Sequence, residues 1–444
     1  MIFGSNYSKF IYIFWQRYKY LSFYEHFCTN HRPKSYICII MDKVAIVILN
    51  WNGEKFLRKY LPALVANTPA SLPSAGGRSN VSIIVADNCS SDNSLQFLKE
   101  NYPHIRTIVL DSNYGFTGGY NRALKQVEAE YFILLNSDIL VPDNWLEPLI
   151  SFMDSHPQAG ICQPKMLSEG RHQQLCIEAT GKEDLTGLFK AHISGGLMDN
   201  SGREGDMERC DRNLSGRKDN LSGRKYETFE YAGACGGFID ILGFPFCRGR
   251  VLSTVEEDMG QYDTPAQCFW ASGACMVVRS SVWKEVGGLD EGFFAHMEEI
   301  DMCWRAQLAG HQVWTVPQSH VFHVGGGTLP NNSPRKLFLN YRNNLLMLYK
   351  NLPTTEGWDA FGGKWSNRKR FIFTRMCVDG LTGIAYLLQG KWSFFTSVIK
   401  AHKAFRAMKK ETAVTLPDNR RFPVFGISTK SLILEKLMGR NIEI

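Results

Sequence analysis

The chain has 444 residues, of which 44% are hydrophobic and 21% charged, a composition that excludes a disordered protein and allows a large α/β core. The formal net charge of +7 is not gathered into one block in the first half of the chain, so it does not indicate a nucleic-acid-binding protein. The twelve cysteines include no C-x-x-C pair and no Cys/His cluster with zinc spacing. This pattern argues against a zinc-binding scaffold and favours buried thiols in a reducing compartment.

Residues 1–40 are aromatic and basic and differ in character from the rest of the chain. Their apolar run, Phe10–Trp15, is too short to span a bilayer, and no small-residue cleavage site follows it. Met41 stands directly before the first strand-like run. We therefore expect translation to start at Met41, with residues 1–40 as an upstream extension without a fold. The alternative is a weak interfacial anchor.

From residue 41 to about 164, short apolar runs alternate with segments of helical spacing. Each apolar run has the length and composition of a strand buried on both faces of a parallel sheet. The alternation predicts an α/β fold with a doubly wound sheet and right-handed crossovers. The expected elements are strand Val44–Leu49, helix Glu54–Asn67, loop Ser71–Asn80, strand Val81–Ala86, helix Leu95–Asn101, strand Ile105–Leu110, a glycine-rich loop Asn113–Asn121, helix Arg122–Glu128, strand Tyr131–Leu135 and a helix that starts near Asn144.

Residues 169–226 interrupt this order, because they are polar, glycine-rich and charged. They include an imperfect repeat, Asn213–Lys218 and Asn220–Lys225, which is too short for a solenoid unit and lacks a hydrophobic face. We expect a flexible insertion. Beyond it the expected elements are strand Cys268–Val278, helix Ser281–Val286, a helix from Phe293 to near Gly310 and strand Val313–Val316.

Residues 331–444 are expected to be helical, basic and aromatic. The apolar stretch Phe371–Phe395 is interrupted by Arg375, Asp379 and three glycines, so we expect no transmembrane helix. Lysines and arginines interleave with Trp392, Phe394, Phe395 and Phe405, which is typical of an amphipathic helix lying on an anionic membrane surface. The alternative is an ordinary basic helix that packs on the core.

Polar residues follow the expected strands at the point where each strand ends. Asp138 follows the buried run Tyr131–Leu135, and open α/β sheets bind their ligands at the carboxyl ends of the strands. Each motif also has a structural interpretation: a helix cap for Asp87 to Asp92, a turn for the glycine segment, and a satisfied core residue for His323. Carboxylates, amides and a histidine on one rim are more than packing requires. The other polar sets are Asn50 with Asn52, Asp87 with Asn88, Gly115–Asn121, Glu298-Glu299-Ile300-Asp301 and His323.

The order and spacing of these motifs resemble the family 2 glycosyltransferases with the GT-A fold, in particular the bacterial rhamnosyltransferase-like branch. The resemblance runs from Val44 to Leu329 without the insertion, and implies a catalytic domain over residues 41–330 with a mixed sheet flanked by helices. A helical, membrane-associating extension would follow over residues 331–444. The matching stretches are Val47–Gly53, Val85–Asp92, Asn113–Arg122, Leu134–Asp138, Trp270–Ala274 and Glu298–Asp301 with Arg305.

The resemblance implies a nucleotide-sugar donor and a divalent cation, Mg²⁺ or Mn²⁺, which suits the diphosphate leaving group. Asp138 would be the metal carboxylate, with Asn136 where the family's motif usually has Asp. His323 resembles the family's distal ligand, and His320 is the less favoured choice. Residues that would bind the donor are Asn50, Asn52, Asp87, Asn88, Gly115, Gly118, Gly119, Asn121 and Asn136.

The same resemblance places the catalytic base in the acidic pair, where Glu299 is the first choice and Glu298 the rival. The base would deprotonate an acceptor hydroxyl for in-line attack at the anomeric carbon, which inverts its configuration. Asp301 and Arg305 are spaced for one helix face, either as an orienting ion pair or as an acceptor contact. Trp270 is expected to be an aromatic platform for the acceptor sugar.

Three other functions compete with the glycosyltransferase interpretation. A nucleotidylyltransferase needs a glycine-rich, arginine-bearing loop after its first strand, where Asn50–Gly53 stands here. A processive polymerase carries clear transmembrane helices and a Gln-x-x-Arg-Trp element, and neither is expected here. A decayed, non-catalytic nucleotide-sugar-binding protein is the remaining alternative. The leading interpretation is an inverting, non-processive glycosyltransferase, cytoplasmic and peripheral on the inner face of the plasma membrane. It would act on a glycan or lipid-linked acceptor in cell-surface polysaccharide synthesis, with thymidine-diphosphate rhamnose as the first donor candidate and uridine-diphosphate sugars next.

Overall fold

The structure is a computed structural model with two units, Met1–Met41 and Asp42–Ile444, and the sheet and its helices belong to the second. The expectations for residues 1–40 and for the Asn213–Lys225 repeat lie outside the described residues. The structure describes residues 41–74, 77–180, 226–251, 254–325, 333–352, 368–411, 424–432, 435 and 438.

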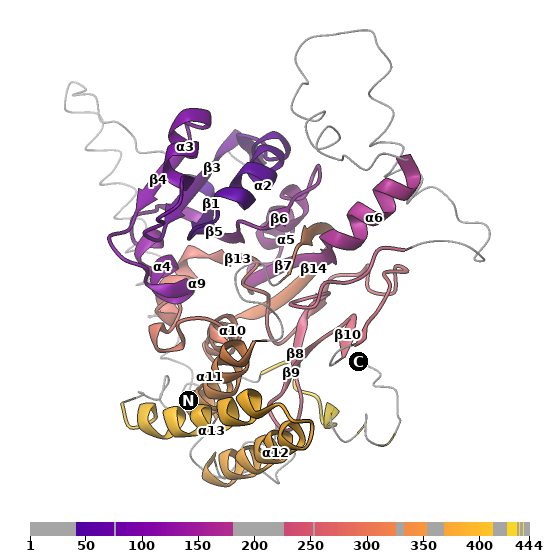
Figure 1. Cartoon of the computed structure of the whole chain (residues 1–444). Coiled ribbons are helices and arrows are strands. Elements are labelled where there is room, and N and C mark those ends of the chain that lie inside the picture. Colours follow the sequence, from indigo (N-terminus) through magenta and orange to yellow (C-terminus); the bar gives the residue numbers. More distant parts are fainter. Residues whose placement is uncertain are drawn as a thin grey trace, which may run out of the picture. The chain divides into compact units, whose positions relative to one another are not determined.

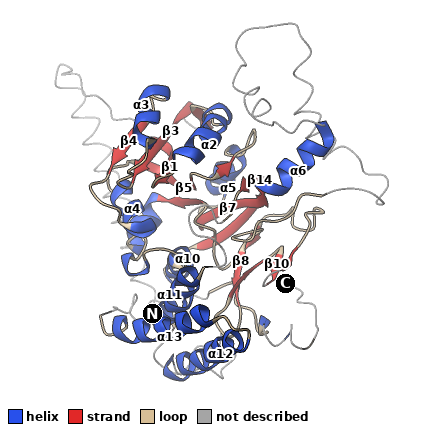
Figure 2. Ribbon diagram, in the orientation of Figure 1, coloured by secondary structure: helices blue, strands red, loops and turns tan. Residues whose placement is uncertain are grey.

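The first half of the main sheet confirms the predicted parallel α/β order (Figures 1 and 2). Strand β1 (Asp42–Asn50) pairs in parallel with β3 (Gly77–Asp87) on one side and with β5 (Ala129–Asn136) on the other, and β4 (Arg106–Val109) pairs in parallel with β3. The register places Asn50 beside Asp87 and Leu49 beside Asn136. The carboxyl ends of these strands, with their polar residues, therefore share one sheet edge.

The second half makes the sheet mixed, as the GT-A resemblance implied. Strand β13 (Cys275–Arg279) runs antiparallel between β5 and β7 (Ala159–Ser168), and β7 pairs in parallel with β14 (Gln312–His323). A register shift between Val316 and His320 lets β14 continue well past the expected strand end. Its last residue, His323, pairs with Ile139 of β6 (Ile139–Leu140), directly after Asp138.

The core lies on both faces of this sheet, because the central strands β1 and β5 contain uninterrupted apolar runs, Val44–Leu49 and Tyr131–Leu135. Along β1, Ala45 and Val47 belong to one apolar cluster, whereas Val44, Ile46 and Ile48 belong to the other. This is the two-face burial expected for a parallel strand. The helices next to the sheet are α2 (Glu54–Asn67), α3 (Ser94–Asn101), α4 (Gly115–Leu124), α5 (Glu147–Ser155), α9 (Ser280–Val286) and α10 (Glu298–Leu308).

Four expected elements differ from the structure. The expected loop Ser71–Asn80 contains strand β2 (Ser71–Ser74), which pairs antiparallel with the start of β3. The expected glycine-rich loop forms most of helix α4. Only the last part of Cys268–Val278 is strand, and residues 169–180 of the expected flexible insertion form helix α6 (Glu169–Thr180). Sequence periodicity is weak in all four segments, so tertiary contacts decide their structure.

A small antiparallel sheet follows the insertion, and three helices follow β14. Its strands are β8 (Gly237–Ile239), β9 (Pro245–Cys247), β10 (Arg250–Val251) and β11 (Thr254–Val255), and β12 (Ala266–Gln267) joins the edge of the main sheet. The helices are α11 (Pro334–Asn351), α12 (Arg368–Leu388) and α13 (Trp392–Met408), with α13 packed against both α11 and α12 (Figure 1).

Helix α12 is long and apolar enough to cross a membrane by length and composition alone. This finding does not show a crossing, so the expectation of no transmembrane helix stays a prediction. The residues counted as interruptions, Arg375 and Asp379, are both buried on its inner face and pair with each other at 2.9 Å. Their charges are therefore compensated locally, which sequence counting does not show.

Candidate active site

The carboxyl ends of β1 and β3 carry polar side chains that are hydrogen-bonded to one another, and this set is called the polar floor. The Asn50 side-chain amide donates to an Asp87 carboxylate oxygen at 3.0 Å and to the Ser90 hydroxyl at 3.1 Å. Asp87 also accepts from the Ser90 backbone N–H at 2.8 Å. Asn52, in a left-handed conformation with φ 49°, accepts from the backbone N–H of Ser91 at 2.7 Å. The Asn50 Oδ1 atom is buried and has no hydrogen-bond partner among the described residues, so one acceptor remains for a ligand.

Asn88 fixes the start of helix α4. Its side chain donates to Asn113 Oδ1 at 3.1 Å and to the Gly115 carbonyl at 2.9 Å, and accepts from the Tyr114 backbone N–H at 3.0 Å. Gly115 has φ +69°, and a Cβ there would lie 2.6 Å from the Phe294 ring. Both conditions require glycine at this position.

The structure corrects the expected role of the glycine segment. The N–H groups at the start of α4, those of Phe116 and Thr117, donate to the Phe294 carbonyl rather than lining an open pocket. A Cβ on Gly118 would approach Tyr114, and one on Gly119 would approach Leu49. These glycines therefore allow α4 to pack closely on its neighbours.

Asn121 is corrected in the same way. Its side chain donates to the Leu289 carbonyl at 2.7 Å and accepts from the Leu289 N–H at 3.0 Å. Asn121 thus connects α4 to the segment that precedes helix α10, and its side-chain amide is fully hydrogen-bonded to protein groups. Asn136, by contrast, is partly exposed at the end of β5, where its backbone N–H donates to the Ala274 carbonyl at 2.9 Å.

Asp138 and His323 face each other, as the pairing of β6 with β14 requires. His323 Nε2 lies 3.4 Å from Asp138 Oδ1, and its Nδ1 lies 3.4 Å from Glu230 Oε1. Burial alone lowers the pKa of His323, but the carboxylates of Glu230 and Asp138 outweigh it and raise the pKa to about 10. A buried imidazolium between two carboxylates marks a position where positive charge is strongly favoured.

This arrangement fits a divalent cation as a partial site. Asp138 Oδ1 and His323 Nε2 are close enough to occupy neighbouring positions around one octahedral ion. Glu230 lies 3.4 Å from the opposite ring nitrogen without a hydrogen bond to it, and a carboxylate on that side is the usual second contact of a metal-binding histidine. No group of three or more His, Cys, Asp or Glu side chains suited to a metal is present within the described ranges, so other oxygen ligands would have to complete the coordination. His320 is the less favoured alternative, because its ring packs edge-on against Phe322.

The acidic pair begins helix α10 after a strained loop. Phe294, His296 and Met297 have φ of 64°, 70° and 73°, a conformation that costs free energy in non-glycine residues. Glu298 and Glu299 follow, and each has a buried carboxylate oxygen without a hydrogen-bond partner among the described residues.

Both carboxyl groups have raised pKa values. Burial, and then the neighbouring Glu299, raises the pKa of Glu298 well above its usual range. Burial raises the pKa of Glu299 to about 7, although backbone N–H groups at the helix start partly oppose this. A carboxylate with a pKa near neutrality is suited to accept a proton from a hydroxyl.

Glu299 and Asp138 lie on the same rim of the sheet. The Cβ of Glu299 is 3.5 Å from where a Cβ on Gly273 would be, and the next residue, Ala274, receives the hydrogen bond from Asn136. Ser137 joins Asn136 to Asp138 in the chain. The structure thus brings together three motifs that are far apart in the sequence.

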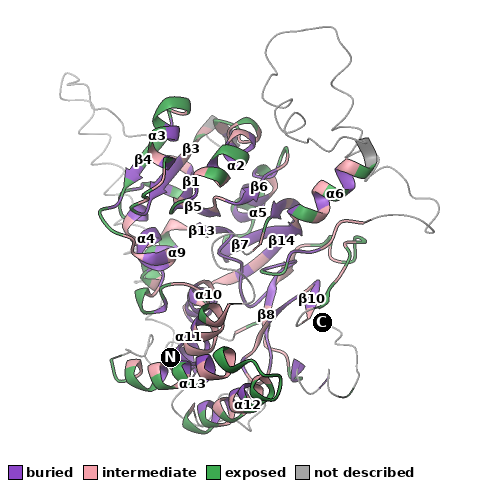
Figure 3. Ribbon diagram, viewed as in Figure 1, coloured by how far each residue is buried: buried purple, intermediate pink, exposed green. Residues whose placement is uncertain are grey.

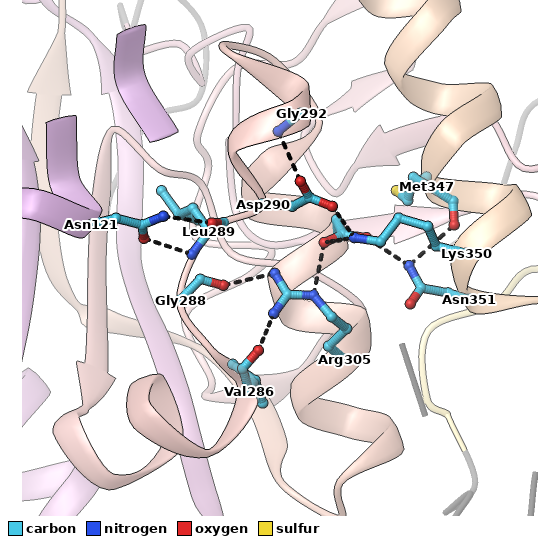
Figure 4. Close-up of polar contacts among 11 residues, drawn as sticks. Asn121, Val286, Gly288, Leu289, Asp290, Gly292, Arg305, Met347, Lys350 and Asn351 are labelled. Carbon is cyan, nitrogen blue, oxygen red and sulfur yellow. Dashed lines mark hydrogen bonds and ion pairs between the residues drawn. The ribbon is translucent and has the colours of Figure 1, made fainter. Parts of the chain in front are cut away.

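Asp301 and Arg305 form the orienting ion pair that was one of the two expectations for them. Arg305 Nε donates to Asp301 at 2.8 Å, and both side chains are buried. Arg305 also donates to the carbonyls of Val286 and Gly288 (Figure 4). Neither side chain is available to an acceptor, so the interpretation of Arg305 as an acceptor contact, and of Asp301 as a catalytic residue, is corrected.

Lys350 of α11 completes this network. Its ammonium lies 2.6 Å from Asp290 and 3.1 Å from Asp301, and the Asn351 amide donates to Asp301 at 2.8 Å (Figure 4). Burial would raise the pKa of Asp301, but Arg305 and Lys350 outweigh it and lower that pKa. Helix α11 thus holds α10 by charge from the side opposite the sheet.

Asn343 of α11 holds the strained loop itself. Its side-chain nitrogen lies within hydrogen-bond distance of the carbonyls of Phe293 at 3.0 Å, Ala295 at 2.8 Å and His296 at 2.7 Å. An amide NH₂ has only two N–H groups, so these three acceptors share them. The loop is therefore fixed between α11 and, through the Phe294 carbonyl, the start of α4.

Trp270 is also corrected, because it is buried and donates to the Phe238 carbonyl at 3.0 Å. It cannot present a ring face to a sugar. Trp51, beside Asn50 and Asn52, and Tyr231, beside Glu230, are the exposed aromatic side chains nearest in sequence to site residues.

Sequence reasoning missed Glu230, Asn343 and Lys350. Asn343 and Asn344 offered a signal, since adjacent asparagines are unfavourable inside a helix unless their side chains bond elsewhere. Glu230 offered none, because it follows the insertion without a recognisable motif.

Comparison with known proteins agrees with the resemblance drawn from the motifs. Residues 45–173 match the family model described as Glycosyl transferase family 2. This segment, which contains the polar strand ends and Asp138, is therefore similar to the family 2 glycosyltransferases, and the resemblance stated from the motifs is confirmed.

Particular relatives are distant. The chain is 21% identical over 338 residues to an N-acetylglucosaminyl-diphospho-decaprenol L-rhamnosyltransferase of Mycobacterium tuberculosis, covering 74% of this chain and 90% of that protein. It is 43% identical over 54 residues to the rhamnosyltransferase WbbL of Escherichia coli K12, covering 12% of this chain and 20% of that one. A solved mannosyltransferase from Pyrobaculum calidifontis, in complex with GDP-Man and Mn²⁺, is 10% identical with a TM-score of 0.42, covering 84% of this chain and 91% of that one.

Proposed function

We propose that the chain is an inverting, non-processive glycosyltransferase that moves one sugar from a nucleoside-diphosphate donor to a hydroxyl of a glycan or lipid-linked acceptor. The observation that carries this proposal is Glu299. It is partly buried, its pKa is raised to about 7, one of its oxygens is buried without a partner among the described residues, and it lies on the rim that carries Asp138.

In the proposed reaction, Glu299 accepts the proton of the acceptor hydroxyl as the oxygen attacks the anomeric carbon. A new carbon–oxygen bond forms on the face opposite the diphosphate, the old bond to the diphosphate oxygen breaks, and the nucleoside diphosphate leaves with its electron pair. One displacement inverts the anomeric configuration. Burial and the neighbouring Glu299 raise the pKa of Glu298, which favours its protonated form, and a protonated carboxyl can donate a hydrogen bond.

Asp138 and His323 would hold Mg²⁺ or Mn²⁺, with Glu230 orienting the imidazole. When bound, the cation supplies charge neutralisation for the diphosphate leaving group. Because His323 holds a proton tightly without metal, binding of the cation is expected to release a proton. Asn50, Asp87 and Asn88 form the polar floor on which the nucleoside would rest.

The donor and acceptor classes come from the relatives. Two of the curated relatives are rhamnosyltransferases, one of them acting on a diphospho-decaprenol-linked sugar by its name. We infer a deoxyhexose donor, thymidine-diphosphate rhamnose first and uridine-diphosphate sugars next, and a lipid-linked acceptor in cell-surface polysaccharide synthesis. Such an acceptor would place the enzyme in the cytoplasm, peripheral on the inner face of the plasma membrane.

A thermal-shift panel tests the donor site, because a ligand that binds the folded state raises the unfolding temperature. The full chain is mixed with thymidine, uridine, guanosine, adenosine and cytidine diphosphates, each with and without Mn²⁺. We expect one base to stabilise the protein in a Mn²⁺-dependent way, and Asp138→Asn to lose the metal dependence. No shift with any nucleotide would instead favour the decayed, non-catalytic alternative. NMR of the product's anomeric proton then tests inversion.

A further inference from the structure

Helix α12 carries a continuous apolar stripe on its outer face. Phe373, Leu381 and Leu388 are 70%, 67% and 83% exposed, and Cys377 and Ile384 between them are exposed as well. These positions are three or four residues apart, so they lie along one side of the helix. Figure 3 shows exposed and buried stretches alternating along the α12 ribbon. Exposed Trp392, at the start of α13, follows them. The outer stripe of α12 is defined here as Phe373, Cys377, Leu381, Ile384, Leu388 and Trp392.

The inner face of α12 is fixed, so the outer stripe cannot rotate into the protein. Arg375 pairs with Asp379 at 2.9 Å, donates to Asn344 of α11 and to the Gly243 carbonyl, and stacks on the Phe244 ring. Phe371 and Ile372 are also buried. Because four contacts of one buried arginine set the orientation, exposure of the outer stripe is a property of the fold.

The charges around the stripe are of one sign. Asp379 is the single acidic residue in the sequence from 368 to 410, and it is buried and paired. Lys369 and Arg370 are exposed at the start of α12, and Lys391 is exposed in the connection between α12 and α13. On α13, the exposed basic residues are Lys400, Lys403 and Arg406. This surface is therefore complementary to anionic groups.

We propose that the outer stripe of α12 docks on an anionic lipid bilayer with the helix lying in the plane of the membrane surface. The apolar side chains enter the boundary between headgroups and acyl chains, and the flanking lysines and arginines meet the lipid phosphates. Exposed apolar surface of this extent, rimmed by charge, is typical of an interaction site.

An in-plane orientation follows from the inner face. A membrane-crossing α12 would have to give up the contacts of Arg375 with Asn344, Gly243 and Phe244. It would also place an arginine and an aspartate in the hydrocarbon region, at a considerable cost in free energy. The surface differs from the one expected from composition, because Phe405 is buried and Phe395 packs near Gly383. Helix α12 supplies the apolar contact, and basic residues of both α12 and α13 supply the charge.

Vesicle flotation of the full chain tests this proposal. Wild type is mixed with phosphatidylglycerol–phosphatidylcholine vesicles, or with phosphatidylcholine alone, at low and high salt. We expect flotation with the anionic vesicles, weakened by salt, and at least ~10-fold weaker binding for Leu381→Gln/Leu388→Gln, because each leucine would lose its burial in lipid. The control is Val109→Gln/Met259→Gln, which changes two similarly exposed apolar residues, 60% and 64%, away from α12, and should bind as wild type does.

Each other outcome overturns the proposal. Equal binding by both double variants, or no vesicle binding by wild type, removes the stripe as a lipid surface. A dimer in light scattering that Leu381→Gln/Leu388→Gln dissolves assigns the stripe to a second copy of the chain. Resistance of membrane-bound protein to alkaline carbonate and high salt indicates a crossing helix. The nucleotide thermal shift of each variant is measured in parallel, so that failure of lipid binding is distinguished from failure of the donor site.

Discussion

Two sets of carboxylates lie within one turn of helix α10, with Glu298 and Asp301 buried and Glu299 partly buried, yet the two sets have opposite surroundings. Asp301 meets two cations and an amide, from Arg305, Lys350 and Asn351, and its pKa is lowered. Glu298 and Glu299 meet no cation that an observed contact records, each keeps an oxygen without a partner among the described residues, and their pKa values are raised. The comparison teaches that burial alone does not identify a catalytic carboxylate; the missing partner does.

The largest effect is expected from removing the base. Glu299→Gln should lower kcat about 10²–10⁴-fold, the usual contribution of a general base, while the dissociation constant of the nucleoside diphosphate stays within about twofold. Steady-state kinetics and calorimetric titration measure the two quantities. Glu291→Gln, on the exposed surface ion pair with Arg122, is the control and should leave kcat unchanged. A comparable loss of donor binding in Glu299→Gln would contradict this division of roles.

The second largest effect is expected on stability, at the ion pair of Lys350 with Asp301. Lys350→Met leaves Asp301 and Asp290 without their shared cation and should lower the free energy of unfolding by about 3–5 kcal/mol, because a buried charge loses a partner. Urea denaturation measures it. Lys403→Met, an exposed lysine on α13, should change the free energy of unfolding by less than about 0.5 kcal/mol. Equal stability of the two variants would show that the network of Figure 4 does not hold α10.

A smaller effect should separate positioning from stability. Asn343→Leu removes the donors to three loop carbonyls and should cost about 1–3 kcal/mol of unfolding free energy. Because the loop sets the place of Glu298 and Glu299, kcat of the folded enzyme should also fall, with donor affinity retained. The same change at Asn340, a less buried residue earlier on α11, is the control. Full kcat in folded Asn343→Leu would reduce its role to structure alone.

The smallest effect is a pH dependence of stability. A carboxyl whose folded-state pKa is raised to about 7 stabilises the fold fully below the unfolded-state pKa of about 4.3, and this contribution is lost as pH rises to 7. The Glu299→Gln variant has no carboxyl at this position, so its stability lacks this dependence on pH. The difference in melting temperature, variant minus wild type, should therefore be more positive at pH 8 than at pH 5 by scanning calorimetry. A difference that is constant with pH would mean that Glu299 titrates as an ordinary exposed glutamate.

The parallel half of the fold was predictable because burial on both faces leaves a plain mark, an uninterrupted apolar run such as Val44–Leu49. The glycine segment was predicted wrongly because its helix depends on contacts with Asn88 and Phe294, which come from other parts of the chain. Arg375 and Asp379 were read as breaks in an apolar segment, whereas their i, i+4 spacing pairs them on one face.

Within the site, strand-end motifs led to Asp138, Asp87 and the acidic pair, because strand direction alone brings them to one edge. Trp270 shows the limit of motif reasoning, since a motif gives no exposure, and Trp270 is buried behind the rim. Glu230 reaches His323 only because β14 shifts register and continues past Val316, and no local pattern in the sequence encodes that continuation.

The contact of Lys350 with Asp301 spans 49 positions of the chain, and this separation has a consequence during synthesis. As the polypeptide leaves the ribosome, the sheet edge, Asp138 and even helix α10 emerge before the lysine that neutralises Asp301 and the asparagine that holds the strained loop. The acidic pair cannot reach its final place until α11 has followed. Since α12 begins soon after α11, a nascent chain would complete the surroundings of the acidic pair at nearly the moment when the helix proposed to bind lipid is synthesised.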